Sequence, residues 1–385
     1  MKIIADQNIL FVKEAFAQLG TVTELASYKI SRDELKDADI ALVRSVTPVG
    51  KELLDGTSVR FVASATIGID HIDVAYLKEN HIGFAHAPGS NADSVAEYVL
   101  AAIIKSTGKR ASELAGMKLA IVGVGNVGSK VCRIASALGI QCLLNDPPKK
   151  RLTGSDSYVS IDEALGEADI VSLHVPLTMA GPDATYHMVN GEFISKVKKG
   201  AILINSSRGK VIDEKTFLES RDSFGAVVLD VWEKEPAINT DTVRIVDIAT
   251  PHIAGYSFDG KIRGTEMIQN AASAFYFHKQ GWTVKEEETS LIGKTLDLRD
   301  SKDPIAEAVE NAYDIMQDDE QFRKILSISK ELQPTFFEES RKNYPRRYEF
   351  PHYKVILSGK QAIEADILLK LRFVVEQSDK VVDGK

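Results

Sequence analysis

The sequence predicts an α/β protein with parallel sheets, organised in two or three domains. Short apolar strands alternate with amphipathic stretches along residues 1–95, and the same alternation restarts near Leu119. Such alternation is typical of a parallel sheet that helices cover on both faces. A chain of 385 residues is also too long for one ordinary hydrophobic core. We therefore expect an α/β fold with more than one sheet.

The first 95 residues supply one of the expected sheets. Two amphipathic stretches, Val12–Leu19 and Val74–Glu79, have the spacing of short helices. The expected strands are Ile3–Ala5, Thr21–Thr23, Ile40–Val43 and Phe61–Ser64. A longer helix at about Ala92–Lys105 follows and is expected to join two lobes.

A second sheet is expected after residue 118. Its strands are predicted at Leu119–Val122, Cys142–Asn145, Ile170–Leu173, Ala201–Asn205, Ala226–Leu229 and Ile245–Ala249. Ser160 and Glu163 form a capping-box pattern at the start of a helix expected at Ile161–Ala168. A further helix is expected at Phe258–His278.

The last part of the chain has a different composition. The stretch Asp297–Asp303 is polar and is expected to be a linker. Helices are predicted at Ile305–Ile315 and Ala362–Val375, and a strand at Tyr353–Leu357. This part is therefore expected to form a small domain that contains both helices and strand.

A glycine pattern in the middle of the chain predicts a dinucleotide-binding turn. The apolar strand ends in Gly123-x-Gly125-x-x-Gly128, and a helical stretch follows. In such a turn the first glycine allows a tight bend, the second lets backbone approach a pyrophosphate, and the third lets the helix pack closely on the strand. The N–H groups of the helix N-terminus bind the phosphates. The pattern therefore predicts a Rossmann-type domain.

Asp146 indicates which dinucleotide binds. It follows the next apolar strand, eighteen residues after Gly128, where a carboxylate accepts from a ribose 2′-hydroxyl. Its charge would repel a 2′-phosphate, although Lys149, Lys150 and Arg151 follow closely and could in principle bind one. We expect the carboxylate to lie nearer the ribose, so NAD is the predicted cofactor.

Composition and charge exclude several classes of protein. The net charge is −8, and no run of basic residues is interleaved with aromatic ones, so we expect no nucleic-acid partner. The longest apolar stretch stops at Lys105, too short to span a membrane, and an acidic residue comes too early for a secretory signal. We expect a cytoplasmic protein with no metal-ligand cluster, in which Cys132 and Cys142 are small core residues.

Three polar residues follow expected strands of the nucleotide lobe. Arg208, Glu235 and His252 come after the fourth, fifth and sixth strands, at the edge where open α/β sheets keep their sites. Arginine can bind a substrate carboxylate with two parallel hydrogen bonds. Histidine can take a hydroxyl proton during hydride transfer, and a neighbouring glutamate orients its ring. Taken singly, each residue has an ordinary structural explanation, but the ordered set predicts a hydroxy-acid dehydrogenase.

Four motifs together resemble a known family. Gly-Val-Gly-Asn-Val-Gly from 123, Asn-Ser-Ser-Arg-Gly from 205, Asp-Val-Trp-Glu-Lys-Glu-Pro from 230 and Pro-His-Ile-Ala-Gly from 251 are similar to the D-isomer-specific 2-hydroxyacid dehydrogenases. The resemblance covers residues 1 to about 280. It implies a split, flavodoxin-like substrate domain, an inserted NAD domain, and catalytic roles for Arg208, Glu235 and His252.

Other stretches resemble one branch of that family, whose substrate is a small phosphorylated hydroxy acid. They include the first nine residues, Val43–Thr47, Ala65–Asp73, and the region that ends in Arg341-Lys-Asn-Tyr-Pro-Arg-Arg. The resemblance implies that Ser45, Thr66 and Tyr256 line the substrate pocket. The NAD-site residues that it implies are Asn126, Val127, Asp146, Ser206, Ser207, Asp230 and Gly255. It also implies a homodimer formed through the C-terminal domain, and the tail after about Ser358 is expected to be longer than this branch usually has.

A phosphorylated acid needs a second cation besides Arg208. Arg44, beside Ser45, is the nearest candidate in sequence, although a salt bridge to an acidic neighbour explains it equally well. The other cations considered are Lys342, Arg346 and Arg347, which either reach a partner subunit's cleft or form a solvated basic face.

The expected domains are residues 1–95 with 256–284 for substrate, 96–255 for NAD, and a C-terminal α+β dimerisation domain of 285–385. His71 is expected to order a loop, and His174 to shape the rim of the cofactor site. Two other functions remain open. One is oxidation of 3-phosphoglycerate or another D-2-hydroxy acid, and the other is a non-catalytic NADH-sensing binding protein.

Overall fold

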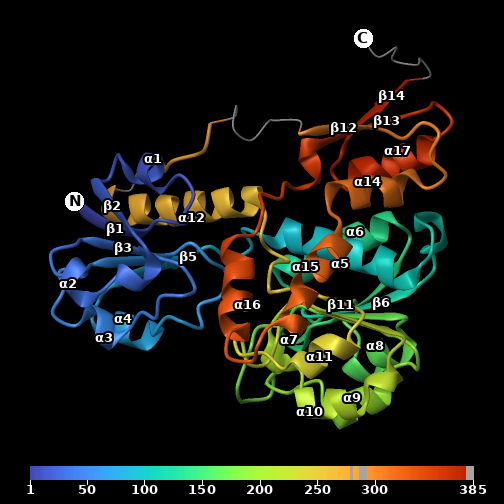
Figure 1. Cartoon of the computed structure of the whole chain (residues 1–385), viewed down its shortest axis with the longest axis horizontal. Helices are drawn as coiled ribbons and strands as arrows, with labels where there is room; N and C mark the ends of the chain where they lie inside the picture. The colour runs from blue at the N-terminus through green and yellow to red at the C-terminus, as the bar shows by residue number, and fades with distance from the viewer. Residues whose placement is uncertain (278–280, 286–292, 379–385) are drawn as a thin grey trace. The chain divides into compact units, whose positions relative to one another are not determined.

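The computed structural model describes residues 1–277, 281–285 and 293–378 (Figure 1). The chain divides into two compact units. The first contains Met1–Ala92 and Ser257–Leu291, and the second contains Asp93–Tyr256 and Ile292–Lys385. The division into three domains stays a prediction, because the NAD-binding and C-terminal regions share the second unit.

The first unit is built on a parallel sheet of five strands in the order β2-β1-β3-β4-β5. This order is that of flavodoxin-like folds, as the fold class predicted. The strands are β1 Lys2–Asp6, β2 Thr21–Leu25, β3 Ile40–Val43, β4 Phe61–Ser64 and β5 Gly83–His86. The strand β5 was not predicted, because its four residues include a glycine and a histidine and lack a long apolar run.

Helices cover both faces of this sheet (Figure 1). Ile3, Phe16 and Ile268 belong to the core beneath α1 and α12, while Ile4 and Leu77 belong to the core on the opposite face. The helices are α1 Val12–Phe16, α2 Arg32–Leu35, α3 Lys51–Leu54, α4 Val74–Glu79 and α12 Phe258–Phe277, with a 3₁₀ turn at Ser27–Lys29.

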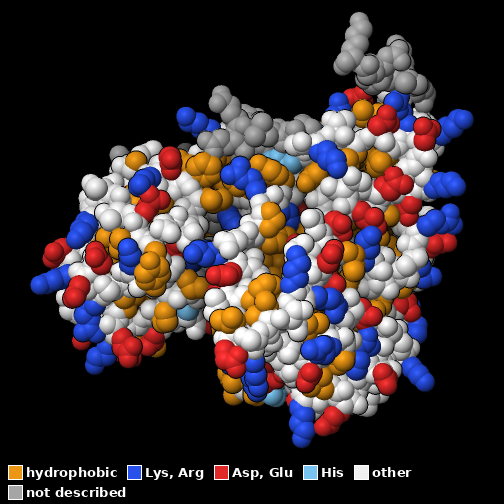
Figure 2. Space-filling model, viewed as in Figure 1, with side chains coloured by type: hydrophobic (Ala, Val, Ile, Leu, Met, Phe, Trp, Pro, Cys, Tyr) orange, Lys and Arg blue, Asp and Glu red, His pale blue; other side chains and the backbone are white. Residues whose placement is uncertain are grey.

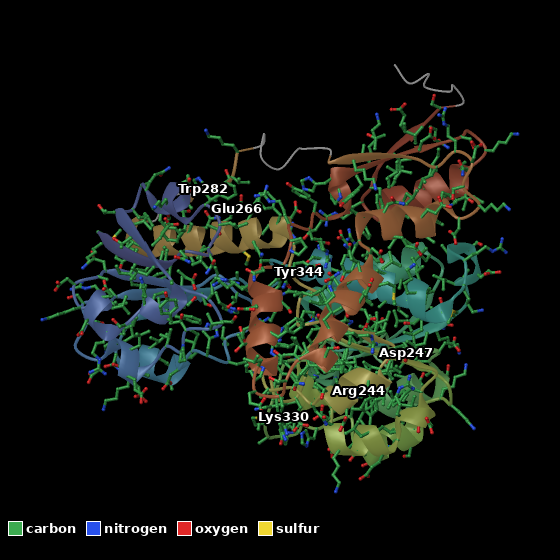
Figure 3. All side chains as sticks on the ribbon, in the orientation of Figure 1. Arg244, Asp247, Glu266, Trp282, Lys330 and Tyr344 are labelled. Atoms are coloured by element: carbon green, nitrogen blue, oxygen red, sulfur yellow. The ribbon has the colours of Figure 1, made fainter. Side chains whose placement is uncertain are left out.

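The end of α12 is followed by a short segment that bonds back to it. The Trp282 N–H donates to Gln269 Oε1 at 2.5 Å, and the Val284 N–H donates to Glu266 Oε1 at 2.9 Å. Figure 3 labels Trp282 and Glu266 in this region. His278, the predicted last residue of the helix, lies outside the described residues.

The second unit contains a six-stranded parallel sheet in the order β11-β10-β9-β8-β6-β7. A parallel bridge between Leu144 and Tyr158 places Tyr158 beside β7 at the end of the sheet, and this completes the Rossmann strand order. The strands are β6 Lys118–Val122, β7 Gln141–Asn145, β8 Ile170–Leu173, β9 Ile202–Asn205, β10 Ala226–Leu229 and β11 Ile248–Ala249. The strand predicted at Ile245–Ala249 is wrong in its first half, because a helix continues to Ile245.

The helices around this sheet begin as the capping residues predict. The Ser160 side chain accepts from the Glu163 N–H at 3.1 Å, which starts α8. The helices are α5 Ala92–Thr107, α6 Asn126–Ala137, α7 Pro147–Thr153, α8 Ile161–Glu167, α9 Gly191–Lys196, α10 Glu214–Glu219 and α11 Thr240–Ile245. Short 3₁₀ turns lie at Ala111–Glu113, Gly209–Val211 and Arg221–Ser223.

The C-terminal region adds a three-stranded parallel sheet in the order β12-β13-β14. The strands are β12 Lys294–Asp297, β13 Tyr353–Leu357 and β14 Val374–Gln377. The helices are α14 Pro304–Ala312, α15 Ile315–Arg323, α16 Gln333–Lys342 and α17 Ala362–Lys370, with 3₁₀ turns at Lys324–Ser327 and Phe350–His352.

Three boundaries predicted in this region are wrong. The expected linker begins on a strand residue, Asp297, so only its remainder connects elements. The expected helix Ile305–Ile315 breaks at Tyr313, whose backbone is extended. The expected helix Ala362–Val375 ends at Lys370, because Arg372 adopts a positive φ of 79° and the β-branched pair after it enters β14.

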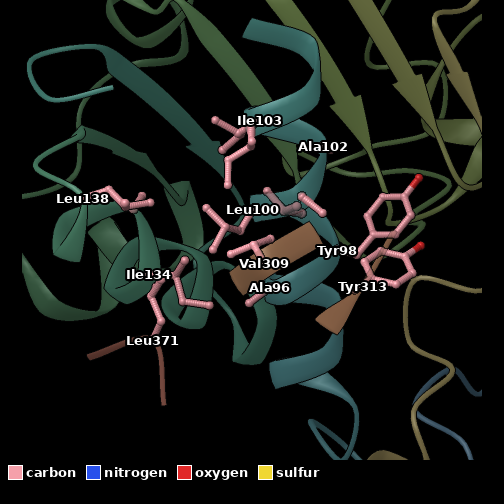
Figure 4. Close-up of a cluster of buried hydrophobic side chains, with 14 of the residues drawn as sticks. Ala96, Tyr98, Leu100, Ala102, Ile103, Ile134, Leu138, Val309, Tyr313 and Leu371 are labelled. Carbon is pink, nitrogen blue, oxygen red and sulfur yellow. The ribbon is translucent and has the colours of Figure 1, made fainter. Parts of the chain in front are cut away.

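One hydrophobic core joins the C-terminal region to the NAD-binding region. Tyr98 of α5 lies 6.0 Å from Tyr313, measured between ring centroids, and Figure 4 shows both rings together with Val309 and Leu371. Arg347 is also buried here, with its guanidinium 3.9 Å from the Tyr313 ring centroid. The interpretation of Arg347 as part of a solvated basic face is therefore wrong.

The surface carries charges of both signs. On the face shown in Figure 2, Lys and Arg side chains are interspersed with Asp and Glu, and no basic stripe forms there. Within the described ranges, no helix has the length and apolar character needed to cross a membrane.

Candidate active site

Arg208 lies on a tight loop at the carboxyl end of β9. Asn205 builds this loop, because its Oδ1 accepts from the Ser207 N–H at 3.0 Å and its Nδ2 donates to the Arg208 carbonyl at 3.0 Å. The Arg208 guanidinium donates from Nη1 to the Ser207 carbonyl at 2.8 Å. Two local bonds therefore fix the backbone from which the half-buried Arg208 side chain extends.

Glu235 and His252 form a direct pair. Glu235 Oε2 lies 2.7 Å from His252 Nδ1, and Oε1 accepts from the Trp232 N–H at 2.9 Å. Burial opposes ionisation of Glu235, but His252, the Trp232 N–H and Arg341 outweigh burial and lower the pKa of this carboxyl below its usual value. An ionised Glu235 fixes which imidazole nitrogen carries hydrogen and leaves Nε2 free to exchange a proton with a ligand.

The backbone at His252 is held in an uncommon conformation. Its φ is +59°, a value that few residues with a side chain adopt. Asp230 stabilises the turn, since its two carboxylate oxygens accept from the Ile253 and Ala254 N–H groups at 2.8 and 3.0 Å, and its carbonyl accepts from the His252 N–H at 2.6 Å. The cofactor role that resemblance implied for Asp230 stays a prediction, while its observed contacts shape the histidine turn.

The loops that carry Arg208 and Glu235 pack against each other. A Cβ atom on Gly209 would lie 1.9 Å from the Trp232 carbonyl carbon, so only glycine permits this approach. The Trp232 side chain is anchored by its indole N–H, which donates to the Thr250 carbonyl at 2.9 Å. The structure therefore brings the predicted arginine loop and the predicted glutamate–histidine pair to one edge of the sheet.

The glycine turn has the shape of a cofactor cradle. Gly123 has a φ of +89°, and a Cβ on Gly128 would lie 2.1 Å from the Gly123 carbonyl oxygen. A Cβ on Gly125 would meet nothing within 4 Å. Gly123 and Gly128 are thus needed for the turn itself, whereas Gly125 leaves open space at the start of α6, which begins with Asn126 and Val127.

This contrast predicts that two alanine substitutions differ in their effect on stability. Gly125→Ala should change the unfolding free energy by less than about 0.5 kcal/mol, because its new methyl group meets no protein atom. Gly128→Ala should destabilise the chain by about 1–3 kcal/mol through overpacking. If the open space admits the pyrophosphate, Gly125→Ala should still raise the Kd for NADH about tenfold or more. Thermal unfolding and NADH titration check both, and an unchanged Kd for Gly125→Ala would contradict the cradle.

Asp146 organises the region beside the glycine turn. Its Oδ2 accepts from the Val124 N–H at 2.9 Å, and its Oδ1 caps α7 by accepting from the Lys149 N–H at 3.0 Å. Lys149 Nζ donates to the Val124 carbonyl at 2.5 Å, and Arg151 pairs with Asp183. Two of the three cations that could have held a 2′-phosphate therefore have protein partners, which agrees with NAD.

Ser206 and Ser207 differ in their surroundings. Ser207 Oγ is buried and donates to Asn205 Oδ1 at 2.8 Å. Ser206 Oγ is also buried, but it has no hydrogen-bond partner among the residues that the structure describes. A buried hydroxyl without a partner is costly, so a ligand oxygen or nitrogen at this position would stabilise it. Ser206 thus fits a cofactor-binding role.

The remaining predicted substrate residues lie in the first unit, except Tyr256. Ser45 is exposed, and Thr66 Oγ1 lies 2.6 Å from Ser64 Oγ and donates to the Gly68 carbonyl at 3.2 Å. Arg44 lies near Lys261, a residue that sequence analysis did not single out. Burial lowers the pKa of Lys261, and the positive charge of Arg44 lowers it further.

Two side chains of the C-terminal region surround Tyr256 in the second unit. The Tyr344 ring meets the Tyr256 ring edge to face at 6.0 Å, and the Arg341 guanidinium lies 5.8 Å from the Tyr256 ring centroid. Figure 3 labels Tyr344 just beyond α16. No role was predicted for Arg341, because no local sequence feature marks its proximity to a site formed by residues more than eighty positions earlier. For Gly255, next to Tyr256, the role stays a prediction.

Other residues considered from the sequence have structural partners. His71 Nε2 lies 3.1 Å from Ser64 Oγ, and His174 Nε2 lies 2.9 Å from Ser172 Oγ. Burial lowers the pKa of His174 to about 3, so this histidine is neutral at physiological pH. Cys132 and Cys142 are half-buried, free and packed against the core.

Known proteins and a known domain family match this chain in sequence. Residues 91–254 match the family described as D-isomer specific 2-hydroxyacid dehydrogenase, NAD binding domain, and residues 291–371 match a domain of unknown function. An erythronate-4-phosphate dehydrogenase from Salinibacter ruber is 42% identical over 96% of this chain and 99% of its own length. The chain belongs to the erythronate-4-phosphate dehydrogenase family.

Other members of the family match equally completely. The Escherichia coli enzyme is 39% identical over 97% of this chain and 98% of its own length. The Chromohalobacter salexigens enzyme covers 99% of this chain, so the tail after Ser358 is not unusually long for the family, contrary to expectation. The predictions of an NAD-dependent dehydrogenase and of its family are confirmed.

Solved structures share the fold of most of the chain. D-lactate dehydrogenase from Aquifex aeolicus, complexed with NAD and lactic acid, has a TM-score of 0.58 at 28% identity and covers 71% of this chain and 95% of its own. The NAD⁺-bound 3-phosphoglycerate dehydrogenase of Entamoeba histolytica has a TM-score of 0.60 at 25% identity. It covers 74% of this chain and 99% of its own. About a quarter of the chain thus has no counterpart in either structure.

Proposed function

We propose that the chain oxidises 4-phospho-D-erythronate to 2-oxo-3-hydroxy-4-phosphobutanoate with NAD, a step in pyridoxal 5′-phosphate synthesis. The observation that carries the proposal is the Glu235–His252 pair beside the Arg208 loop, in a chain related over its whole length to enzymes named for this substrate. When bound, NAD accepts the hydride that leaves C2 of the substrate. The residues of this chain supply binding, orientation and proton transfer.

Arg208 is proposed to bind the C1 carboxylate and the C2 oxygen. A guanidinium offers parallel N–H donors that match two oxygens, and its charge stabilises negative charge on the C2 oxygen as the proton leaves. Because Asn205 and Gly209 fix the loop on both sides of Arg208, little conformational freedom of the backbone is lost when substrate binds.

His252 is proposed to accept the C2-hydroxyl proton at Nε2. The Glu235 carboxylate holds the opposite ring nitrogen at 2.7 Å and stabilises the imidazolium that forms. Glu235 itself stays ionised, since its pKa is lowered by His252 and by the Trp232 N–H despite burial. The pair therefore moves one proton from the substrate hydroxyl to His252 and later to solvent.

The other predicted site residues complete the proposal. Ser45, Thr66 and Tyr256 are proposed to contact substrate, and Arg44, with Lys261 nearby, to add positive charge that attracts its phosphate. The residues proposed for NAD are Gly123, Gly125, Asn126, Val127, Gly128, Asp146, Ser206, Ser207, Asp230 and Gly255. For Asp230 we propose an indirect role through the histidine turn.

A substrate panel tests the proposed function. Purified enzyme with NAD is given 4-phosphoerythronate, 3-phosphoglycerate or D-lactate, and NADH formation is followed by absorbance. We expect the highest kcat/KM with 4-phosphoerythronate. A higher value with either of the other acids would assign the chain to a different D-2-hydroxy acid, and no turnover with any of them, together with NADH binding, would favour a non-catalytic NADH-sensing protein.

We further propose a cytoplasmic homodimer formed through the C-terminal region. Its support is a group of exposed apolar side chains on α17 and β14, namely Ile363, Leu369 and Val374, which are 74%, 57% and 40% exposed. Sedimentation of the full chain should give the mass of two copies. A monomer mass at micromolar concentration would contradict the dimer.

A further inference from the structure

The C-terminal region reaches the candidate site through one face of α16. Phe337 is fully buried, and its ring meets that of Phe322 at 5.9 Å. Phe322 in turn lies 5.6 Å from Trp232, the residue whose N–H holds Glu235. An unbroken series of packed rings therefore fixes α16 against the loop that carries the proposed catalytic glutamate.

Arg341 lies one helical turn beyond Phe337 and on the same face. Its guanidinium lies 5.8 Å from the ring centroids of both Phe337 and Tyr256. The side chain is only 13% exposed, although its guanidinium carries a permanent positive charge. The packing of α16 therefore places a positive charge against Tyr256, four residues after His252.

The hydrogen-bonding capacity of this guanidinium is incompletely used. Its nearest carboxylate contact is Glu338 Oε1 at 3.6 Å from Nη1, longer than a good hydrogen bond, and Glu338 is 45% exposed. The buried Nε has no hydrogen-bond partner among the residues that the structure describes. A buried charged donor without a partner is costly, so an anionic ligand with several oxygens would stabilise it.

The positive charge of Arg341 interacts with the proposed catalytic residue Glu235. Burial by itself lowers the pKa of Arg341, but Tyr256, Glu235 and Glu338 raise it above its usual value. The reciprocal effect appears at Glu235, whose pKa Arg341 helps to lower. Arg341 therefore places a permanent positive charge near Glu235 and Tyr256 in the second unit, in addition to the charge of Arg208.

We propose that Arg341 binds the phosphate of the substrate beside Tyr256, so that the C-terminal region supplies a specificity residue of the site. This inference rests on the proposed function. It gives a role to residues 291–371, which match a domain of unknown function. The D-lactate dehydrogenase structure is consistent with this role. Its bound acid has no phosphate, and it covers only 71% of this chain.

The experiment compares 4-phosphoerythronate with erythronate, which differs only by the phosphate. The dissociation constants of both acids are measured by calorimetry on the enzyme–NADH complex, for wild type, Arg341→Gln and Arg341→Lys. We expect Arg341→Gln to weaken 4-phosphoerythronate binding by about 10- to 100-fold and erythronate binding by less than about threefold. Arg341→Lys should recover part of the loss, because it keeps the charge and loses the planar donors.

Lys330→Gln is the matched control, since Lys330 is an exposed cation that lies just before the same helix. It should leave both dissociation constants unchanged. Equal losses on both acids for Arg341→Gln would overturn the inference and indicate that Arg341 acts only by positioning Glu235 and Tyr256. Unchanged binding of both acids would overturn it as well.

The wild-type measurement separates this inference from the proposed function. If wild type neither binds nor oxidises 4-phosphoerythronate better than erythronate, the proposed function fails. If wild type prefers the phosphorylated acid and Arg341→Gln keeps the full preference, only the role of Arg341 fails. Thermal unfolding and the Kd for NADH of each variant show that the fold is retained.

Discussion

Replacing His252 by glutamine is expected to lower kcat for 4-phosphoerythronate oxidation by about 10²–10⁴-fold. Glutamine can occupy the space of the imidazole and can bond to Glu235, but it cannot take up a proton. The Nε2 side of His252 is the proposed proton acceptor, because Nδ1 is already 2.7 Å from Glu235 Oε2. Steady-state rates with saturating NAD and substrate measure the effect.

A matched control for this substitution exists in the same lobe. His187 also has a positive φ, of 50°, and its Nε2 lies 3.2 Å from Glu233 Oε1. His187→Gln should therefore keep kcat within about twofold of wild type, and both variants should bind NADH normally. A His252→Gln enzyme with kcat within tenfold of wild type would remove His252 from the proton-transfer step.

Replacing Arg208 by lysine is expected to lower kcat/KM by about 10²–10³-fold. Lysine keeps the charge but offers a single point donor, so the paired bonds to the substrate carboxylate and C2 oxygen cannot both form. Each hydrogen bond to a charged group contributes about 1.5–3 kcal/mol, and two are weakened. Because the proposed contact with the C2 oxygen strengthens as the proton leaves, kcat should fall and KM should rise.

The control for Arg208→Lys is Arg244→Lys. Arg244 lies on α11 and is 56% exposed in its side chain (Figure 3). Among the described residues its one ion pair is long, with Nε 3.9 Å from Asp241 Oδ1. Its replacement should not change the kinetics. An Arg208→Lys enzyme that showed a raised KM with an unchanged kcat would mean that Arg208 binds substrate without stabilising the transition state.

The candidate site could be predicted from sequence where its residues follow strand ends. The carboxyl ends of parallel strands meet at one edge of a sheet, so Arg208, Glu235 and His252 were expected together although 44 residues separate the first from the last. The structure places Glu235 against His252 and packs the Arg208 loop beside them. The glycine turn was predictable for the same reason, since its function depends on local backbone geometry.

Residues whose position depends on long-range packing could not be predicted in this way. Arg341 reaches Tyr256 only because Phe337 packs against Phe322, which in turn packs against Trp232, about ninety residues earlier in the chain. Arg347 has the sequence context of a solvated basic cluster, yet it is buried with Nη2 donating to the Ser94 carbonyl at 2.6 Å. Local composition carries no information on such contacts.

The fold was predicted best where strands are apolar and bounded by helices. The first four strands of each large sheet were expected within two residues, and both sheets have the strand orders of their fold class. The short strands β12 and β14 were missed because polar residues occupy their exposed faces and only their neighbours in the sheet define them. Their pairing with β13 decides their conformation.

In the proposed reaction, a hydride leaves C2 of the phosphorylated acid while His252 takes the hydroxyl proton. The transfer can be followed with 4-phosphoerythronate carrying deuterium at C2, with the NADH product isolated and examined by mass spectrometry. We expect one deuterium in each NADH formed, together with a four-carbon 2-oxo acid that has lost it. Unlabelled NADH, or deuterium retained in the acid, would rule out hydride transfer from C2.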